Sequence, residues 1–434
     1  MEIINFYNKI ELNQPSYVKD HNSGLFLPYK NVTSKYKYNN LFLNMKLPSF
    51  CVLRINWSEI TGYVVDEETI NDKVKLFDGN SLFQFAANIN RFLNYNSFYN
   101  NQQESYIELF KFTKSLLKPQ YIPKYQELLQ KNVYNKDPAV NHEYRPLIDQ
   151  ATIFNFIKKI IIHNKFDGGD TLESSEKIID VAELLFACTD HLSNNLENLD
   201  TSTESRKTVY SDLSQNIVFN NSESNKMLLS RYFNIYFKII KDVGKQTNQY
   251  KIDVFKIFED NYGITLESFF VYCFGIYCYF FRETDSKLEE VVNNVILNIE
   301  SNFFSDSGIR KSQLEKVLNL LSGDIKFFKK ELNTELVQNE NNFTYSNLCF
   351  KNKPFLKLDQ NQFLLIDLQF LSEKFTAGIY WLIFDIIKSN KKLTGQFSEL
   401  YGLSIQKYIE NLFDKFIIKN AKYSPNKAFF NFIK

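Results

Sequence analysis

The sequence predicts a mainly α-helical protein: an irregular bundle of many helices, with a small β-rich unit at the N-terminus and an α+β section at the C-terminus. Two observations predict this class. The 434 residues include only 13 Gly and 9 Pro, so helix breakers are few, while 42 Phe and 26 Tyr supply large side chains for helix contacts. Apolar residues also recur three or four positions apart through the middle of the chain, which is the period of an amphipathic helix. The length is sufficient for two or three domains.

Residues 1–80 are expected to form the β-containing N-terminal unit. Short apolar runs in this part of the chain are separated by polar turns that contain Asn, Pro, Gly and Asp, a pattern typical of short strands. The expected strands are 24–28, 41–43, 49–55 and 62–65.

Residues 81–336 are expected to form a helical domain. The most polar interval, 198–224, is the predicted internal linker or mobile loop. The most apolar run, 269–281, is expected at the centre of the main core, as a helix buried on most faces. It is shorter than the roughly twenty residues that cross a bilayer, so no membrane association is predicted. The other predicted helices are 81–95, 106–117, 125–130, 146–163, 173–192, 225–243, 288–299 and 312–321.

Residues 337–434 are expected to form the α+β section. The predicted strands are 347–350, 354–358 and 362–366, and residues 359–361 join the last two as a hairpin turn. Two predicted helices, 371–389 and 402–417, come next, followed by strand-like segments at 416–418 and 428–433. Such an apolar tail either closes the protein's own sheet or pairs with a partner, and the sequence leaves both readings open.

The charge balance limits the partners of the chain. With 51 basic and 50 acidic residues the net charge is +1, so no global field attracts nucleic acid or an anionic membrane. Lys outnumbers Arg by about six to one, and Asn is abundant, as expected from AT-rich codons. Because Arg supplies the bidentate contacts that read guanine, sequence-specific DNA recognition is disfavoured, whereas backbone contact through Lys stays open.

Two runs of Lys and aromatic residues are candidate contacts for nucleic acid, because rings can stack on bases while ammonium groups touch phosphate. The first consists of Lys35, Tyr36, Lys37 and Tyr38, and the second places Lys329 and Lys330 directly after Phe327 and Phe328. In a chain this rich in Tyr, Phe and Lys, such runs also arise by chance.

Cysteine and histidine do not indicate a metal site. The five cysteines are scattered without the spacing of a zinc knuckle, and a reducing cytoplasm is the expected compartment. His163 precedes three carboxylates, but the spacing is not that of a calcium loop, and Asp170 with Glu173 is the pattern of a helix start. The pair Asp190 and His191 is interpreted as a helix end. No metal ligand is therefore predicted.

Known catalytic motifs are absent from the sequence. It contains no GxxxxGK[ST] phosphate loop, no GxGxxG after a strand, no GxSxG elbow and no HExxH helix. The most distinctive stretch lies between about 345 and 420. It contains the hairpin with Pro354, the step into a helix at Asp367, the run 375–382 and the run 397–413.

This C-terminal stretch resembles the segment that, in large bacterial phage-defence proteins, leads from a helical region into a PD-(D/E)XK restriction-type nuclease domain. The resemblance covers under a fifth of the chain. In those proteins a Gly precedes a helix with an acidic residue, and strands with an Asp and an acidic-X-Lys pair follow. Here Ile405 and Gln406 follow Gly402 where the acidic residue is expected, and Glu410 comes one turn later. Near Asp367, Gln369 stands where Lys would be.

The leading hypothesis is therefore a cytoplasmic bacterial protein of antiphage defence. It would act as a sensor or scaffold subunit that binds nucleic acid or a protein encoded nearby, either a nuclease or another effector, without a catalytic site or cofactor of its own. One alternative is a metal-dependent nuclease that uses Asp359, Asp367 and Glu410 with Mg²⁺. Another is a non-catalytic helical interaction module outside immunity.

Overall fold

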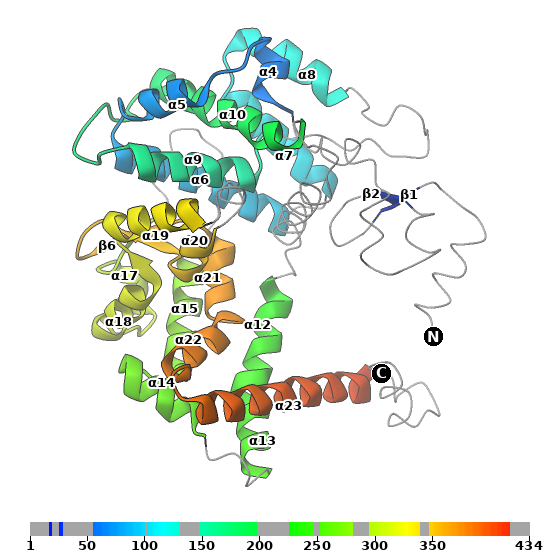
Figure 1. Cartoon of the computed structure of the whole chain (residues 1–434), viewed down its shortest axis with the longest axis vertical. Coiled ribbons are helices and arrows are strands. Elements are labelled where there is room, and N and C mark those ends of the chain that lie inside the picture. The colour runs from blue at the N-terminus through cyan, green and yellow to red at the C-terminus, as the bar shows by residue number, and fades with distance from the viewer. Residues whose placement is uncertain are drawn as a thin grey trace. The chain divides into compact units, whose positions relative to one another are not determined.

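The computed structural model describes residues 17–19, 26–28, 55–99, 102–130, 147–197, 225–246, 252–280, 295–338 and 347–416. Helices dominate these residues and a small mixed sheet accompanies them, which confirms the predicted mainly α class with an α+β section (Figure 1). The chain forms two compact units. Unit 1 comprises Met1–Ser222, Tyr279–Ser301 and Leu321–Gln369, and unit 2 comprises Glu223–Cys278, Asn302–Leu320 and Phe370–Lys434. Both units take segments from either side of the predicted boundary at residue 336.

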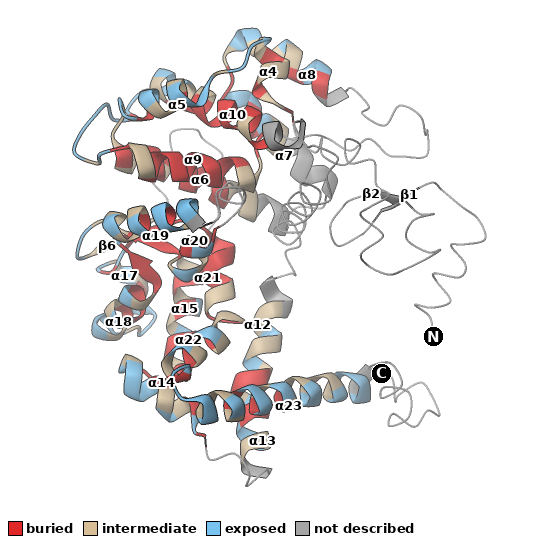
Figure 2. Ribbon diagram, in the orientation of Figure 1, coloured by how far each residue is buried: buried red, intermediate tan, exposed pale blue. Residues whose placement is uncertain are grey.

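Unit 1 is built around helix α9, Gln150–His163. The Asp149 side chain accepts a hydrogen bond of 2.8 Å from the Thr152 amide and so caps the helix start. All ten residues from Thr152 to Ile161 are buried, because α5, α6, α10 and α19 pack around the helix (Figure 2). The helices described in unit 1 are α4 (Trp57–Thr61), α5 (Glu67–Val74), α6 (Gly79–Tyr99), α7 (Gln102–Ser115), η2 (Pro119–Tyr121), α8 (Ile122–Gln130), α9, α10 (Ser175–Glu197), α19 (Ile325–Gln338) and α20 (Leu348–Asn352).

A four-stranded sheet in unit 1 has the order β3-β6-β5-β4. The antiparallel hairpin of β5 (Phe355–Lys357) and β6 (Gln362–Leu365) confirms the predicted turn at 359–361. β3 (Ile296–Asn298) pairs antiparallel with β6, and β4 (Ser322–Gly323) pairs parallel with β5. Near the N-terminus, β1 (Tyr17–Lys19) and β2 (Phe26–Pro28) form a separate antiparallel pair.

The loop after α9 is fastened to the α5–α6 connection by one buried side chain. The Nδ2 atom of Asn164 donates to the carbonyl oxygens of Val74 (2.8 Å) and Phe77 (2.9 Å), and its Oδ1 accepts from the Phe166 amide (2.7 Å). Phe166 has a φ of 61°, a left-handed conformation that is uncommon for residues other than glycine. The Asn164 side chain therefore both holds the strained loop and satisfies two carbonyl groups where α5 leads into α6.

The secondary-structure elements that the structure describes in unit 2 are helices. α12 (Asn225–Asn234) continues through the π-helical turn η3 (Ile235–Ile239) into α13 (Ile240–Gln246). The others are α14 (Val254–Tyr262), α15 (Leu266–Phe280), α17 (Asn302–Asp306), α18 (Lys311–Leu321), α21 (Leu368–Lys374), α22 (Gly378–Ile387) and α23 (Lys391–Phe416). Aromatic rings form much of the core of the unit: Phe270 lies 5.3 Å from Phe237 and 5.4 Å from Phe375 between ring centroids.

Several sequence-based elements differ in the structure. The expected strand 62–65 is the connection between α4 and α5, and the expected strand at 347–350 lies in the helical segment α20. The expected helix 288–299 is wrong in its described part, because residues 296–298 form β3. The helix expected over 371–389 is divided between α21 and α22, and α23 starts eleven residues before the expected 402. Short apolar runs have no period that distinguishes a strand from a buried helix, which explains the second error.

Other expectations lie outside the described residues. They include the loop 198–224, the strand 41–43 and the C-terminal strands beyond residue 416. Within the described ranges, no single helix has the length and apolar character of a membrane span; the α14–α15 pair passes that test only jointly, with a 66° bend between its helices.

We predict that Asn164→Ala destabilises unit 1 by about 2–4 kcal/mol, because it leaves three backbone groups without their hydrogen-bond partner. Thermal and urea unfolding of the full chain measure the effect. Asn333→Ala, at an exposed position of α19, is the matched control and should change stability by less than about 0.5 kcal/mol. Equal stability of the two variants would contradict the role of Asn164.

Candidate functional site

Asp359, one of the three predicted catalytic residues, lies in the turn between β5 and β6. Its side chain is exposed, and Oδ1 accepts hydrogen bonds from the amides of Asn361 (2.7 Å) and Gln362 (2.8 Å). This is the usual role of aspartate in a tight turn. The carboxylate thus has a clear structural task in the hairpin.

Asp367, the second predicted catalytic residue, is 2% exposed and directly precedes α21. Its Oδ2 atom accepts hydrogen bonds from the side-chain amides of Asn90 (2.6 Å) and Asn94 (2.9 Å) on α6. Asn90 also donates to the carbonyl oxygen of Ile366 (3.0 Å), and Gln150 donates to Asn94 (3.2 Å). The carboxylate is therefore held within a buried amide network, which fixes the chain after β6 to α6.

Glu410, the third predicted catalytic residue, is exposed on α23 of unit 2, where Lys407 Nζ and Gln406 Nε2 each lie 3.2 Å from its carboxylate. Asp359 and Asp367 belong to unit 1. Within the residues that the structure describes, no group of three or more His, Cys, Asp or Glu side chains is arranged to hold a metal ion. The use of these three carboxylates with Mg²⁺ remains a prediction.

The Lys329 ammonium group is engaged inside unit 1. Its Nζ donates a 2.8 Å hydrogen bond to the carbonyl oxygen of Asn164 and lies 5.6 Å from the centre of the Phe166 ring. Lys330 is exposed beside it on α19. The other predicted contacts, Lys35, Tyr36, Lys37 and Tyr38, lie outside the described residues. Among the predicted nucleic-acid contacts that the structure describes, Lys330 is exposed to solvent.

Sequence reasoning missed a cluster of titratable side chains around the buried Lys158 of α9. Lys158 is 1% exposed, and burial lowers its pKa to about 8, although Cys349 and Glu335 partly oppose that shift. Burial also raises the pKa of the Cys349 thiol. Oε1 of Glu335 accepts from the Cys349 amide at 3.2 Å. The spacing of apolar residues predicts that α9 is a helix with a buried face. It does not predict that a lysine of this helix is buried as well.

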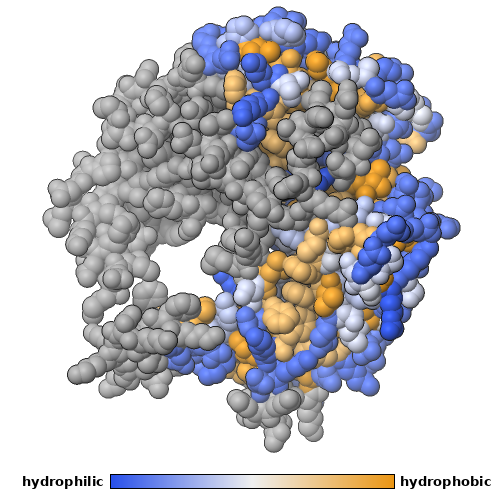
Figure 3. Space-filling view, turned by 180° about the vertical axis from the view of Figure 1, so that it is seen from behind, coloured by the Kyte–Doolittle hydropathy of each residue, from blue (hydrophilic) through white to orange (hydrophobic). Residues whose placement is uncertain are grey.

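Unit 2 presents an unusual surface on α15. We call it the open face of α15 and define it by Glu267, Val271, Phe274 and Cys278, which share one side of the helix at spacings of four, three and four. Val271 is 59% exposed and Phe274 is 44% exposed, while Glu267 and Cys278 are half-buried. The helix is expected to be buried on most faces, and this is the face that stays exposed. Figure 3 shows that apolar side chains reach the surface of the described chain in several patches.

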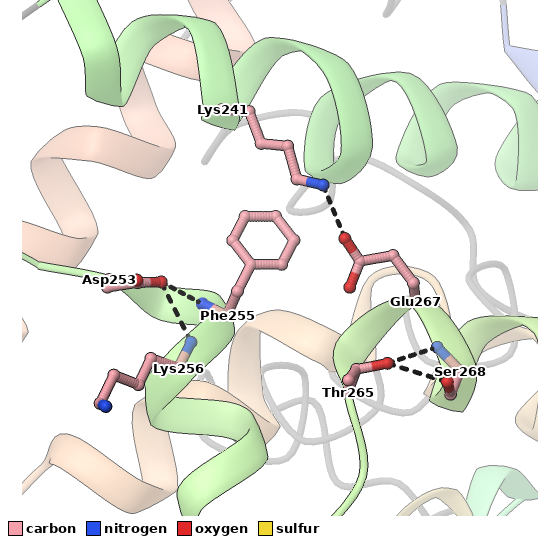
Figure 4. Close-up of polar contacts among 7 residues, drawn as sticks. All are labelled: Lys241, Asp253, Phe255, Lys256, Thr265, Glu267 and Ser268. Carbon is pink, nitrogen blue, oxygen red and sulfur yellow. Dashed lines mark hydrogen bonds and ion pairs between the residues drawn. The ribbon is translucent and has the colours of Figure 1, made fainter.

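One border of the open face is formed by α12 and α13, which run antiparallel to α15. Phe233 lies 5.8 Å from Phe270 between ring centroids, and eight residues further on Lys241 forms a 2.6 Å ion pair with Glu267, one turn earlier in α15. Lys241 also lies 4.7 Å from the centre of the Phe255 ring (Figure 4). These contacts connect α12, α13 and α14 to α15 along this border.

The starts of the two neighbouring helices are fixed by side-chain caps (Figure 4). Asp253 accepts from the amides of Phe255 (3.1 Å) and Lys256 (3.0 Å) at the start of α14. Thr265 accepts from the Ser268 amide (3.1 Å) and donates to its hydroxyl (2.8 Å) at the start of α15. The two caps hold the helix starts that carry Phe255 and Glu267, the two residues that Lys241 contacts.

The opposite border of the open face comes from the loop between α17 and α18. The Arg310 amide donates to the Tyr272 hydroxyl at 3.2 Å. Gly275 lets this loop approach closely, since a Cβ atom there would lie 2.6 Å from Cδ1 of Ile309. The open face is thus a strip of α15 between two borders.

The π-helical turn η3 ties this region to α23. It places Tyr236 inside unit 2, 6.0 Å from Tyr401 of α23 between ring centroids. Burial, followed by the effect of the Tyr401 hydroxyl, raises the pKa of Tyr236 well above its usual value. Single π turns are frequent at functional sites. Here the turn orients α12, and with it Phe233, beside α15.

Comparison with known proteins found no match to a family model, to a curated protein or to a solved structure.

We predict that Lys158→Met stabilises the protein at pH 7 and that its advantage declines as the pH rises. The unfolded chain, with a lysine pKa near 10.5, binds more protons than the folded one between pH 8 and 10.5, so the stability of the unsubstituted protein increases across that window. The advantage of Lys158→Met should therefore fall by about 2–3 kcal/mol between pH 7 and pH 10. Urea unfolding at several pH values measures it.

Lys326→Met serves as the control for this measurement, because it removes an ammonium group from an exposed position of α19 and should change stability little at either pH. An effect of Lys158→Met that does not vary with pH would show that burial does not disfavour the charged form of Lys158.

Proposed function

We propose that this chain is a non-catalytic subunit that binds a partner protein, and that it acts as a sensor or scaffold in bacterial antiphage defence. The observation that supports binding is the open face of α15, where Val271 and Phe274 are largely exposed and Phe233, 42% exposed, lies at the border. Contiguous apolar patches on the surface of a folded protein, when they are large, mark sites where another molecule binds. The defence context comes from the C-terminal resemblance, and the cytoplasm is the proposed compartment.

The placement of the three carboxylates gives less support to a nuclease. Asp359 stabilises a turn and Asp367 is bound by two asparagine amides, so both have structural tasks that compete with metal binding. A partner protein, encoded nearby and acting as nuclease or effector, supplies catalysis in the proposed complex.

Co-expression of the full chain with the products of its neighbouring genes tests the proposed function. We expect one of these proteins to co-elute with it in size-exclusion chromatography at a defined stoichiometry, measured by light scattering. Because apolar contacts weaken little with salt, the complex should persist at 0.5 M NaCl, an ionic strength at which the Debye length is only about 4 Å. Elution of the chain free of all these proteins would falsify the proposal.

The nuclease alternative makes a different prediction. Under our proposal the purified chain leaves single- and double-stranded DNA and RNA intact in the presence of Mg²⁺ or Mn²⁺, as measured by gel electrophoresis. Asp359→Ala is the informative variant, because the side chain is exposed and its loss should leave the rest of unit 1 folded. Cleavage by the original chain that disappears in Asp359→Ala would establish the nuclease instead.

A further inference from the structure

The open face of α15 has the spacing of a helix-packing seam. Glu267, Val271, Phe274 and Cys278 follow one another at intervals of four, three and four residues, the alternation found where two helices pack side by side. At about 1.5 Å per residue the strip is about 16 Å long, the length of three turns of helix. The strip therefore suits one additional helix of about eleven residues.

The borders of the strip add positive charge. On the α12 side, Lys238 is exposed and its Nζ lies 5.8 Å from the centre of the Phe233 ring. On the other side, Arg310 is exposed in the loop before α18. Among the described residues, neither side chain forms an ion pair, whereas the acidic member of the strip, Glu267, is paired with Lys241. Two cations on opposite borders thus flank an apolar floor.

We propose that the open face of α15 binds an acidic amphipathic helix of a partner protein. This inference rests on the proposed function and names the chemistry of the partner. Apolar side chains of the incoming helix cover Val271 and Phe274, and carboxylates on its two flanks reach Lys238 and Arg310. Such charge complementarity accelerates association and selects against basic helices, while the apolar contacts supply most of the affinity.

Nucleic acid fits this surface less well. A single strand binds where successive aromatic rings offer stacking platforms along a basic groove. The strip has one ring, Phe274, next to the aliphatic Val271 and the small Cys278. The ion pair between Lys241 and Glu267 also leaves no excess positive charge at its first turn.

Two synthetic helical peptides of about 14 residues test the inference with the full chain. Both carry Leu at the same three- and four-residue spacings, and one has Glu and the other Lys at the flanking positions. Fluorescence anisotropy is expected to show at least about tenfold tighter binding of the Glu peptide, and the combined change Lys238→Glu and Arg310→Glu is expected to reverse that preference. Equal binding of the two peptides, or binding of neither, overturns the inference.

Substitutions on the floor of the strip provide the second arm. Val271→Gln and Phe274→Gln alter exposed side chains, so the fold should be retained, as circular dichroism will verify. Each is expected to weaken binding of the Glu peptide at least about tenfold. Leu412→Gln, at an exposed apolar position of α23, is the matched control and should leave binding unchanged. Unchanged affinity in both floor variants contradicts the assignment of the site.

The inference can fail while the proposed function stands. A neighbouring gene product that co-elutes equally with the original chain and with Phe274→Gln binds elsewhere, which rejects the α15 site alone. A chain that captures none of those proteins yet binds the Glu peptide rejects the proposed function and retains the helix-binding surface.

Discussion

Complete burial of α9 is the constraint on which the rest of unit 1 depends. A helix presents side chains in all directions, so ten consecutive buried residues require packing on every side, and α5, α6, α10 and α19 provide it. The same packing buries two lysines of α9. Lys159 reaches the edge and pairs with Glu67 at 2.8 Å, which lowers the pKa of that carboxyl group against the opposing effect of burial. Lys158 stays in the interior, where burial disfavours its charge.

Buried polar side chains connect the elements that surround this core. Asn164 ties the loop after α9 to the start of α6, and Asn90 and Asn94 tie α6 to Asp367 at the end of the sheet. In these bonds the side-chain amide nitrogens replace water with partners inside the protein, as polar groups removed from solvent require, whereas the buried Oδ1 atom of Asn90 has no hydrogen-bond partner among the described residues. Asp367 is a catalytic candidate through the C-terminal resemblance, and in the structure its Oδ2 atom accepts hydrogen bonds from the side-chain amides of Asn90 and Asn94.

In unit 2 the central apolar helix, α15, is covered less completely than α9 is in unit 1. Its aromatic rings cover α15 on the side of Phe270 and Cys273, and the helix remains exposed at Val271 and Phe274. The borders of that surface are held by the Lys241–Glu267 ion pair and by the approach of Ile309 to Gly275. Under the proposed helix binding, a strip between two such borders would require little reorganisation.

The sequence by itself determined the helical class, the hairpin turn at 359–361 and the approximate position of most helices, since these follow from local periodicity and turn chemistry. Tertiary structure alone decided that 296–298 joins the sheet, that Lys158 is inside and that Asp367 is bound by Asn90 and Asn94, because these depend on residues distant in the chain. The same holds for α15. Its apolar composition predicts burial on most faces, and only the packing of its neighbours decides that Val271 and Phe274 are the residues left exposed.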